Sequence, residues 1–110
     1  MSEPTLVPVL EQLLARQGDL VVRFPQASLP APELAMSVSF PRIEIVLEGE
    51  LADDCLDEPL GPLQALYIPS GRWNAPQWRG PATSLSILFS KQKLGFSLQR
   101  FDGKKFVEIR

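Results

Sequence analysis

The sequence has no histidine, a single cysteine and no long apolar run. Without histidine, the chain cannot form a Ser-His-Asp or Cys-His catalytic group, a histidine-rich zinc site or a two-histidine iron site. The lone thiol, Cys55, excludes an internal disulfide and fits a reducing cytosol, so we expect it to be structural. Neither a leader peptide nor an apolar run of about 18 residues is present, so we expect a cytoplasmic protein that does not enter a membrane.

The chain also lacks an excess of positive charge. It has 110 residues and a formal net charge of −2, with lysine and arginine scattered along it. A length of this order is typical of one domain with one core, and the charge gives no support for direct binding of nucleic acid by this segment.

The N-terminal part, residues 1–18, has the spacing of an amphipathic helix. We expect the helix over residues 8–17, with Pro8 in its first turn and Gly18 after its end. Its apolar stripe either packs on its own domain or contacts a second copy of the chain.

From residue 20 onward the pattern changes to alternating apolar and polar residues, which is typical of half-buried strands. The expected strands cover residues 20–24, 38–40, 42–48, 63–68, 83–89, 94–101 and 104–110. Residues 25–32 form an irregular connector, residues 53–59 a solvated acidic turn, and Asp102-Gly103 a hairpin turn. Short strands with Pro- and Gly-rich connections indicate an all-β sandwich or barrel over residues 20–110. Because the chain stops inside the last expected strand, we expect it to be a fragment of a longer protein or one cut at a domain edge.

Both tryptophans lie in one short segment, residues 68–78, beside two prolines and a glycine. Proline and glycine restrict or specialise the backbone, so the segment is expected to be a rigid corner at the end of a strand. Two hypotheses stay open for Trp73 and Trp78: they cover the core, or they form a platform that faces a ligand.

Catalytic chemistry finds little support in the remaining residues. Paired carboxylates would have to come from Glu44, Glu48, Glu50 or the acidic turn, and the first three share one side of an expected strand. We interpret them as an outward, solvated row. No glycine-rich phosphate loop is present, so we do not expect an enzyme.

Two short glycine motifs follow expected strands. Gly49 lies at the end of one apolar strand, and Pro69-x-Gly71 lies at the end of another, about twenty residues later. This pattern resembles the cupin family, in which a metal-binding histidine follows the second motif. Asn74 occupies that position here, the ligands of the first motif are missing, and Arg42 stands about where its carboxylate would be. The resemblance implies a cupin-like double-stranded β-helix, a jelly-roll barrel, without a metal or another cofactor.

Three further segments, residues 40–50, 68–78 and 85–97, resemble the N-terminal domain of bacterial AraC-family transcriptional regulators. The similarity covers residues 38–101, and the string Trp73-Asn74-x-Pro76-x-Trp78 is its most specific part. It implies one cupin-like domain, residues 1–110, that senses a small-molecule effector or forms a homodimer. DNA would be bound by a separate C-terminal domain that these 110 residues do not include. The alternatives are a stand-alone cupin enzyme and a carbohydrate-binding module.

On this hypothesis the candidate ligand-binding residues are Arg42, Tyr67, Trp73, Asn74 and Trp78. Arg42 would pair with an anionic ligand if it points inward, although an outward, solvated arginine is the default expectation. Asn74 would hydrogen-bond a ligand or, as we favour, backbone groups of its own turn. Tyr67 precedes the corner and its hydroxyl could serve either role.

Overall fold

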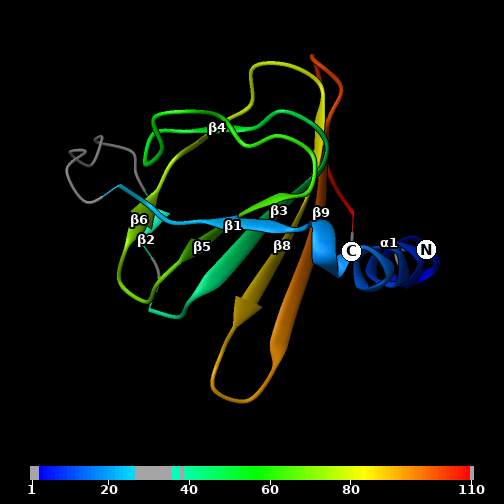
Figure 1. The fold of residues 1–110 in the computed structure, drawn as a ribbon, viewed down its shortest axis with the longest axis horizontal. Coiled ribbons are helices and arrows are strands. Elements are labelled where there is room, and N and C mark those ends of the chain that lie inside the picture. The colour runs from blue at the N-terminus through cyan, green and yellow to red at the C-terminus, as the bar shows by residue number, and fades with distance from the viewer. Residues whose placement is uncertain (1–2, 27–35, 38, 110) are drawn as a thin grey trace.

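The computed structural model describes residues 3–26, 36–37 and 39–109. Among them, one α-helix and a short 3-10 turn precede ten strands (Figure 1). These elements are α1 (Glu3–Ala15), the 3-10 turn (Gln17–Asp19), β1 (Val21–Arg23), β2 (Met36–Ser37), β3 (Arg42–Gly49), β4 (Ala52–Asp53), β5 (Gln64–Ile68), β6 (Trp73–Asn74), β7 (Pro76–Gln77), β8 (Ala82–Phe89), β9 (Leu94–Phe101) and β10 (Phe106–Ile109). The prediction of an all-β class is confirmed.

Six strands form one mixed sheet in the order β1-β5-β3-β8-β9-β10. The β1–β5 pair is parallel and the other pairs are antiparallel. Two small antiparallel pairs, β2–β6 and β4–β7, and an isolated bridge between Leu51 and Leu60 complete the β pairing of the described residues. The three longest strands, β3, β8 and β9, lie next to one another in the sheet. Each alternates apolar with small or polar residues over most of its eight positions, which is typical of a strand.

The hydrophobic core lies between one face of this sheet and the segment that carries β4. Figure 1 shows that segment crossing above β3 and β5. The buried residues of the core are Val46, Leu51, Cys55, Leu56, Leu60, Leu66 and Ile68, and Trp73 and Trp78 pack against them. We call the side of the sheet that faces this core the inner face. The inner face therefore holds both the core and, as described below, the candidate site.

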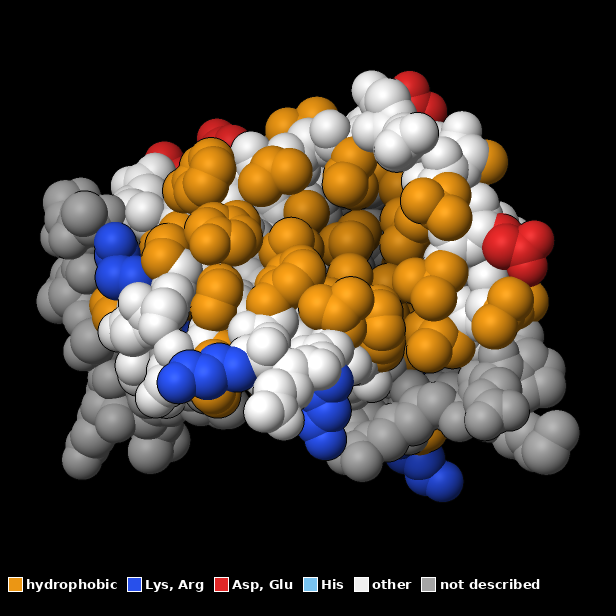
Figure 2. Space-filling model, turned by 90° about the horizontal axis from the view of Figure 1, so that it is seen from below, with side chains coloured by type: hydrophobic (Ala, Val, Ile, Leu, Met, Phe, Trp, Pro, Cys, Tyr) orange, Lys and Arg blue, Asp and Glu red, His pale blue; other side chains and the backbone are white. Residues whose placement is uncertain are grey.

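Several side chains on the outer face are apolar as well. Strand register places Tyr67 beside Ile43 there, and the ring of Tyr67 meets Phe24 edge-on at 6.0 Å between ring centroids. Phe24 is 62% exposed and Val22, on β1, is 47% exposed. Hydrophobic side chains gather broadly over the face of the molecule that Figure 2 shows. Helix α1 approaches the outer face near Leu98, where a cavity of about 280 Å³ separates the helix from the sheet.

Glycine is required at Gly49, where the β3 strand ends. Its φ is +77°, and a Cβ atom there would lie 2.2 Å from the carbonyl oxygen of Pro81. The register of β3 and β8 shifts just before it, between Val46 and Glu48, so Gly49 pairs with Ala82. The backbone of the chain thus closes tightly at one end of the sheet.

Some expected elements are placed differently. The helix begins at Glu3 and ends at Ala15 instead of covering residues 8–17, and Pro8 lies inside it. Pro8 has no N–H group, so the helix lacks one hydrogen bond near its N-terminal end, the bond to the carbonyl of Pro4. The expected strand at 38–40 is wrong for residues 39 and 40, which form a bend before β3. Most of the expected connector, residues 27–32, lies outside the described residues.

One other segment is more regular than expected, and one expected turn is confirmed. The corner at residues 68–78 contains two-residue strands, because Trp73-Asn74 pairs with β2 and Pro76-Gln77 pairs with β4. The hairpin at Asp102-Gly103 is confirmed. Gly103 has a φ of +102°, and the Asp102 carboxylate accepts hydrogen bonds from the backbone N–H groups of Lys104 and Lys105.

The 13 residues of α1 are too few to cross a membrane, and no other α-helix occurs in the described part of the chain.

Candidate functional site

The inner face of the sheet contains a cavity of about 500 Å³ that small side chains leave open. Ser86 lies on β8, and Gly95 and Ser97 lie on β9, where larger residues would fill the space. Strands β3 and β10 and the β6–β7 corner supply the other walls. A cavity of this volume is in the range that holds small organic ligands.

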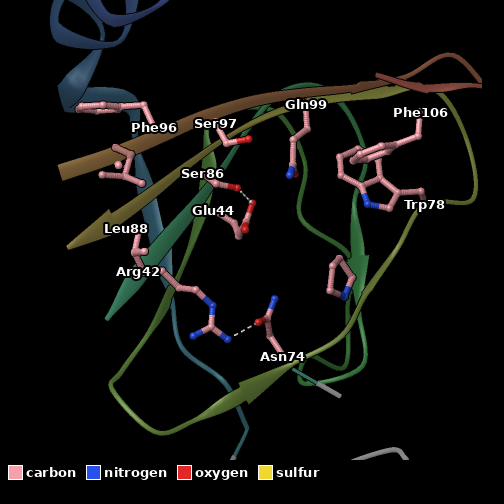
Figure 3. A pocket seen from close by; sticks show the side chains of 13 residues that line it. Arg42, Glu44, Asn74, Trp78, Ser86, Leu88, Phe96, Ser97, Gln99 and Phe106 are labelled. Atoms are coloured by element: carbon pink, nitrogen blue, oxygen red, sulfur yellow. Dashed lines mark hydrogen bonds between the residues drawn. The ribbon is translucent and has the colours of Figure 1, made fainter. Parts of the chain in front are cut away.

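Glu44 forms a row across the sheet with two serines. Strand register places Glu44 opposite Ser86, and Ser86 opposite Ser97. The Ser86 hydroxyl donates a hydrogen bond of 2.6 Å to Glu44 Oε2 (Figure 3). The Ser97 hydroxyl is buried and has no hydrogen-bond partner among the described residues. The row therefore presents a carboxyl group and two hydroxyls at one side of the cavity.

Burial changes the acidity of Glu44. Loss of hydration raises its pKa to about 7, because the charged form is poorly solvated between the strands. The Ser86 hydrogen bond and the charge of Arg42 oppose this rise, while the charge of Asp53 adds to it. Glu44 thus changes its charge near neutral pH. The expectation of an outward, solvated row is wrong for Glu44 and holds for Glu48 and Glu50, which are exposed.

Arg42, Asn74 and Asp53 form a second polar group at the edge of the cavity. Arg42 Nη2 donates a hydrogen bond to Asn74 Oδ1, and Asn74 Nδ2 donates one of 3.0 Å to Asp53 Oδ2. Asp53 Oδ1 accepts bonds from the backbone N–H groups of Cys55 and Ala75 at 3.0 and 2.8 Å. The asparagine therefore joins a cation and an anion from two different strands.

Three expectations need correction at this group. Arg42 is buried, with 9% exposure, and lines the cavity instead of pointing outward, and burial lowers its pKa from 12.5. Asn74 bonds two side chains and not the backbone of its own turn. Asp53 is 5% exposed and belongs to the core side of the molecule, although its neighbours do form a solvated acidic turn. In each case the sequence gives the residue type but not the side of the strand on which it lies.

Trp78 forms the opposite wall with Phe106. The two rings meet nearly edge-on, with centroids 5.2 Å apart, and Phe101 lies 6.3 Å from the indole centroid. In Figure 3, Trp78 and Phe106 lie on one side of the cavity and Glu44 and Ser86 on the other. The two hypotheses for Trp78 are therefore not exclusive, since the residue packs on the core and also lines the cavity.

The five residues expected to bind a ligand do not all meet. Arg42, Asn74 and Trp78 line the cavity. Trp73 packs against the core, and Tyr67 lies on the outer face with Phe24; neither lines this cavity. The residues missed from sequence are Glu44, Ser86, Ser97 and Phe106, and the alternation of β3, β8 and β9 was the available signal for the first three.

Cys55 is buried beside the acidic turn and does not line the cavity. Burial, with the nearby Asp53 carboxylate, raises the pKa of its thiol to about 12, so the thiolate is not formed at neutral pH. Among the described residues, no three or more Asp, Glu and Cys side chains are grouped so that they could hold a metal ion.

Comparison with known proteins gives one informative match. The chain is 51% identical over 102 residues to a protein of Escherichia coli (strain K12) named "Uncharacterized HTH-type transcriptional regulator YijO". The match spans 88% of this chain and 36% of that protein, so the chain covers about a third of its relative's length. No family model matches the chain. No solved structure matches it either.

Proposed function

We propose that residues 1–110 are the regulatory domain of a bacterial AraC-family transcriptional regulator, a metal-free, cupin-like domain that binds a small effector. The observation that carries this proposal is the 51% identity to a relative named as an HTH-type transcriptional regulator. The resemblance of residues 38–101 to AraC-family N-terminal domains supports the finer assignment.

DNA binding belongs to another part of such a protein. A helix-turn-helix motif needs two packed α-helices, and the described residues contain only α1. The relative is also much longer than the part that this chain matches. We therefore assign the signal-receiving role to this domain and DNA recognition to a separate C-terminal domain.

The cavity on the inner face is the effector site of this proposal. It combines an apolar wall at Trp78 and Phe106 with polar groups at Glu44 and Arg42, which is the usual composition of a small-molecule site. The domain needs no metal or cofactor for this role and carries out no catalysis.

Self-association through the outer face is the second part of the proposal, with a second copy of this chain as the partner. Exposed Val22 and Phe24 supply the apolar contacts.

One experiment tests whether effector binding and DNA binding belong to separate domains. It compares the 110-residue chain with its parent protein, the full-length product of the same gene. The purified 110-residue chain should not shift DNA from the promoter region of its own gene, whereas the parent protein should. The coding sequence beyond Arg110 should contain two helix-turn-helix motifs. Sequence-specific DNA binding by residues 1–110 alone, or a parent protein without such motifs, would overturn the assignment.

A further inference from the structure

The chemistry of the cavity walls narrows the class of effector. One side carries the carboxyl group of Glu44, held by the Ser86 hydroxyl, with the Ser97 hydroxyl next in the row. The other side carries the indole of Trp78, whose position is supported by Phe101 and Phe106. A cavity with a carboxyl group on one side and aromatic rings on the other is suited to an organic cation, because carboxylates and aromatic ring faces attract positive charge.

The charge balance of the surrounding residues favours the same class. Arg42 is the cation nearest to Glu44 along β3, but Asn74 links its guanidinium to the Asp53 carboxylate. Arg42 therefore interacts with two carboxylates, Glu44 more strongly than Asp53, and the three groups together carry one negative charge when Glu44 is ionised. A monocation brings this total to zero. An anion would either double the negative charge or require Glu44 to stay protonated.

We propose that the cavity binds a small organic ammonium ion, with its cationic group at Glu44 and its apolar body against Trp78 and Phe106. This inference rests on the proposed effector-binding role of the cavity and names the chemical class of the effector. The volume of about 500 Å³ accommodates a ligand with a ring or a short alkyl chain.

Binding of such a cation is coupled to the charge of Glu44. In the chain without ligand, the pKa of the Glu44 carboxyl is about 7, so below neutral pH a proton competes with the cation for the carboxylate. The groups that face Glu44 from neighbouring elements are Arg42 on its own strand, Asp53 from β4, the uncharged Ser86 from β8 and the uncharged Ser97 from β9. We therefore expect the affinity for a cation between pH 5.5 and 8 to follow the ionisation of Glu44.

Three probes of nearly equal size test the class: 2-phenylethylammonium, 2-phenylethanol and phenylacetate. Each is titrated into the 110-residue chain while the indole N–H resonances of the two tryptophans are followed by NMR. At pH 8 we expect the ammonium ion to bind about tenfold more tightly than the alcohol, and phenylacetate to bind most weakly. At pH 5.5 the ammonium ion should lose about tenfold in affinity, while the alcohol changes little.

Two matched variants separate the site from general charge effects. Glu44→Gln keeps the size of the side chain and an oxygen for Ser86, and should abolish the preference for the ammonium ion. Glu48→Gln removes the same charge from an exposed position on the same strand and should keep that preference. An amide resonance spectrum that matches the spectrum of the unsubstituted 110-residue chain confirms that each variant is folded.

The outcomes distinguish this inference from the proposed function. Equal or tighter binding of the alcohol or of phenylacetate overturns the cation assignment and leaves the cavity as an effector site. A preference that survives in Glu44→Gln also overturns it. If none of the three probes moves the Trp78 resonance, both the cation assignment and the effector role of this cavity are contradicted.

Discussion

Asn74 Nδ2 lies 3.0 Å from Asp53 Oδ2, and this hydrogen bond ties the β6–β7 corner to the β4 segment. The other side of the same amide accepts a bond from Arg42 on the central sheet. One asparagine side chain thus connects the central sheet, the β6–β7 corner and the β4 segment. Asn74 thus serves as a structural link between charged groups of the described chain.

Removal of the Asp53 carboxylate should weaken the fold strongly. Asp53→Ala leaves the N–H groups of Cys55 and Ala75 and the Asn74 amide without their acceptor. Buried donors that lose a charged partner cost about 1–3 kcal/mol each, so we expect a loss of roughly 3–5 kcal/mol in the free energy of unfolding, measured in urea. The control, Asp54→Ala, removes an exposed carboxylate whose only hydrogen bond in the described structure comes from the side chain of Gln77, and should cost less than about 1 kcal/mol. Equal losses for the two variants would contradict the role of Asp53.

Glu44 should make the stability of the domain fall as pH rises. Its pKa is about 7 in the folded chain and 4.5 in the unfolded chain, so the folded state binds more protons between these values. The stability from the neutral carboxyl is therefore present below about pH 4.5 and is lost as pH rises through 7. Glu44→Gln should remove this loss, which is at most about 3 kcal/mol, so that its stability relative to the parent chain rises between pH 5 and pH 8. Urea unfolding at both pH values measures the change, and Glu48→Gln should show no such trend.

Substitution of Gly49 by alanine should destabilise the fold more than the same substitution at Gly71, because Gly49 lies close to the backbone of Pro81. Gly49→Ala places a methyl group 2.2 Å from the Pro81 oxygen at a φ of +77°, so the backbone has to move. Gly71→Ala has a similar φ of +79° but meets no atom within 4 Å. We expect about 1 kcal/mol of destabilisation for Gly71→Ala, from the backbone conformation alone, and at least twice that for Gly49→Ala. Similar midpoints of thermal unfolding for the two variants would contradict the packing of β3 against Pro81.

Self-association should depend on Phe24 and not on Phe106. Both rings are exposed, at 62% and 49%, but Phe24 lies on the outer face and Phe106 at the cavity. Phe24→Ser should therefore shift sedimentation of the chain toward the monomer, because it removes apolar area from the proposed interface. Phe106→Ser serves as the matched control and should leave the sedimentation profile unchanged. A monomeric parent chain at all concentrations would refute the proposed homodimer.

The strands could be predicted from sequence because their alternation is regular. β8 and β9 have clear period-2 patterns, and Asp102-Gly103 marks the turn that follows them, so these elements lie within one or two residues of their predicted positions. The two-residue strands of the corner could not be predicted, since they exist only through pairing with β2 and β4. Local pattern contains no information about such partners.

The cavity was only partly predictable for a related reason. Alternation places Glu44 and Arg42 on the same side of a strand, but it does not say whether that side faces solvent or protein. The answer depends on the β4 segment and the β6–β7 corner, which cover the inner face through contacts between residues far apart in the chain, such as Asn74 with Asp53. Tyr67 was expected at the ligand site for the same reason, but its side chain points to the outer face, where it contacts Phe24.

The central claim is that the inner-face cavity is an effector site, and a titration with 2-phenylethylammonium at pH 8 tests it most directly. Trp78 lines the cavity and Trp73 does not, so their indole N–H resonances, assigned with Trp78→Phe and Trp73→Phe, report on the site and on the core separately. We expect a saturable shift of the Trp78 resonance, with the Trp73 resonance nearly unchanged, and loss of that shift in Glu44→Gln. A Trp78 resonance that does not move, while outer-face signals do, would contradict it.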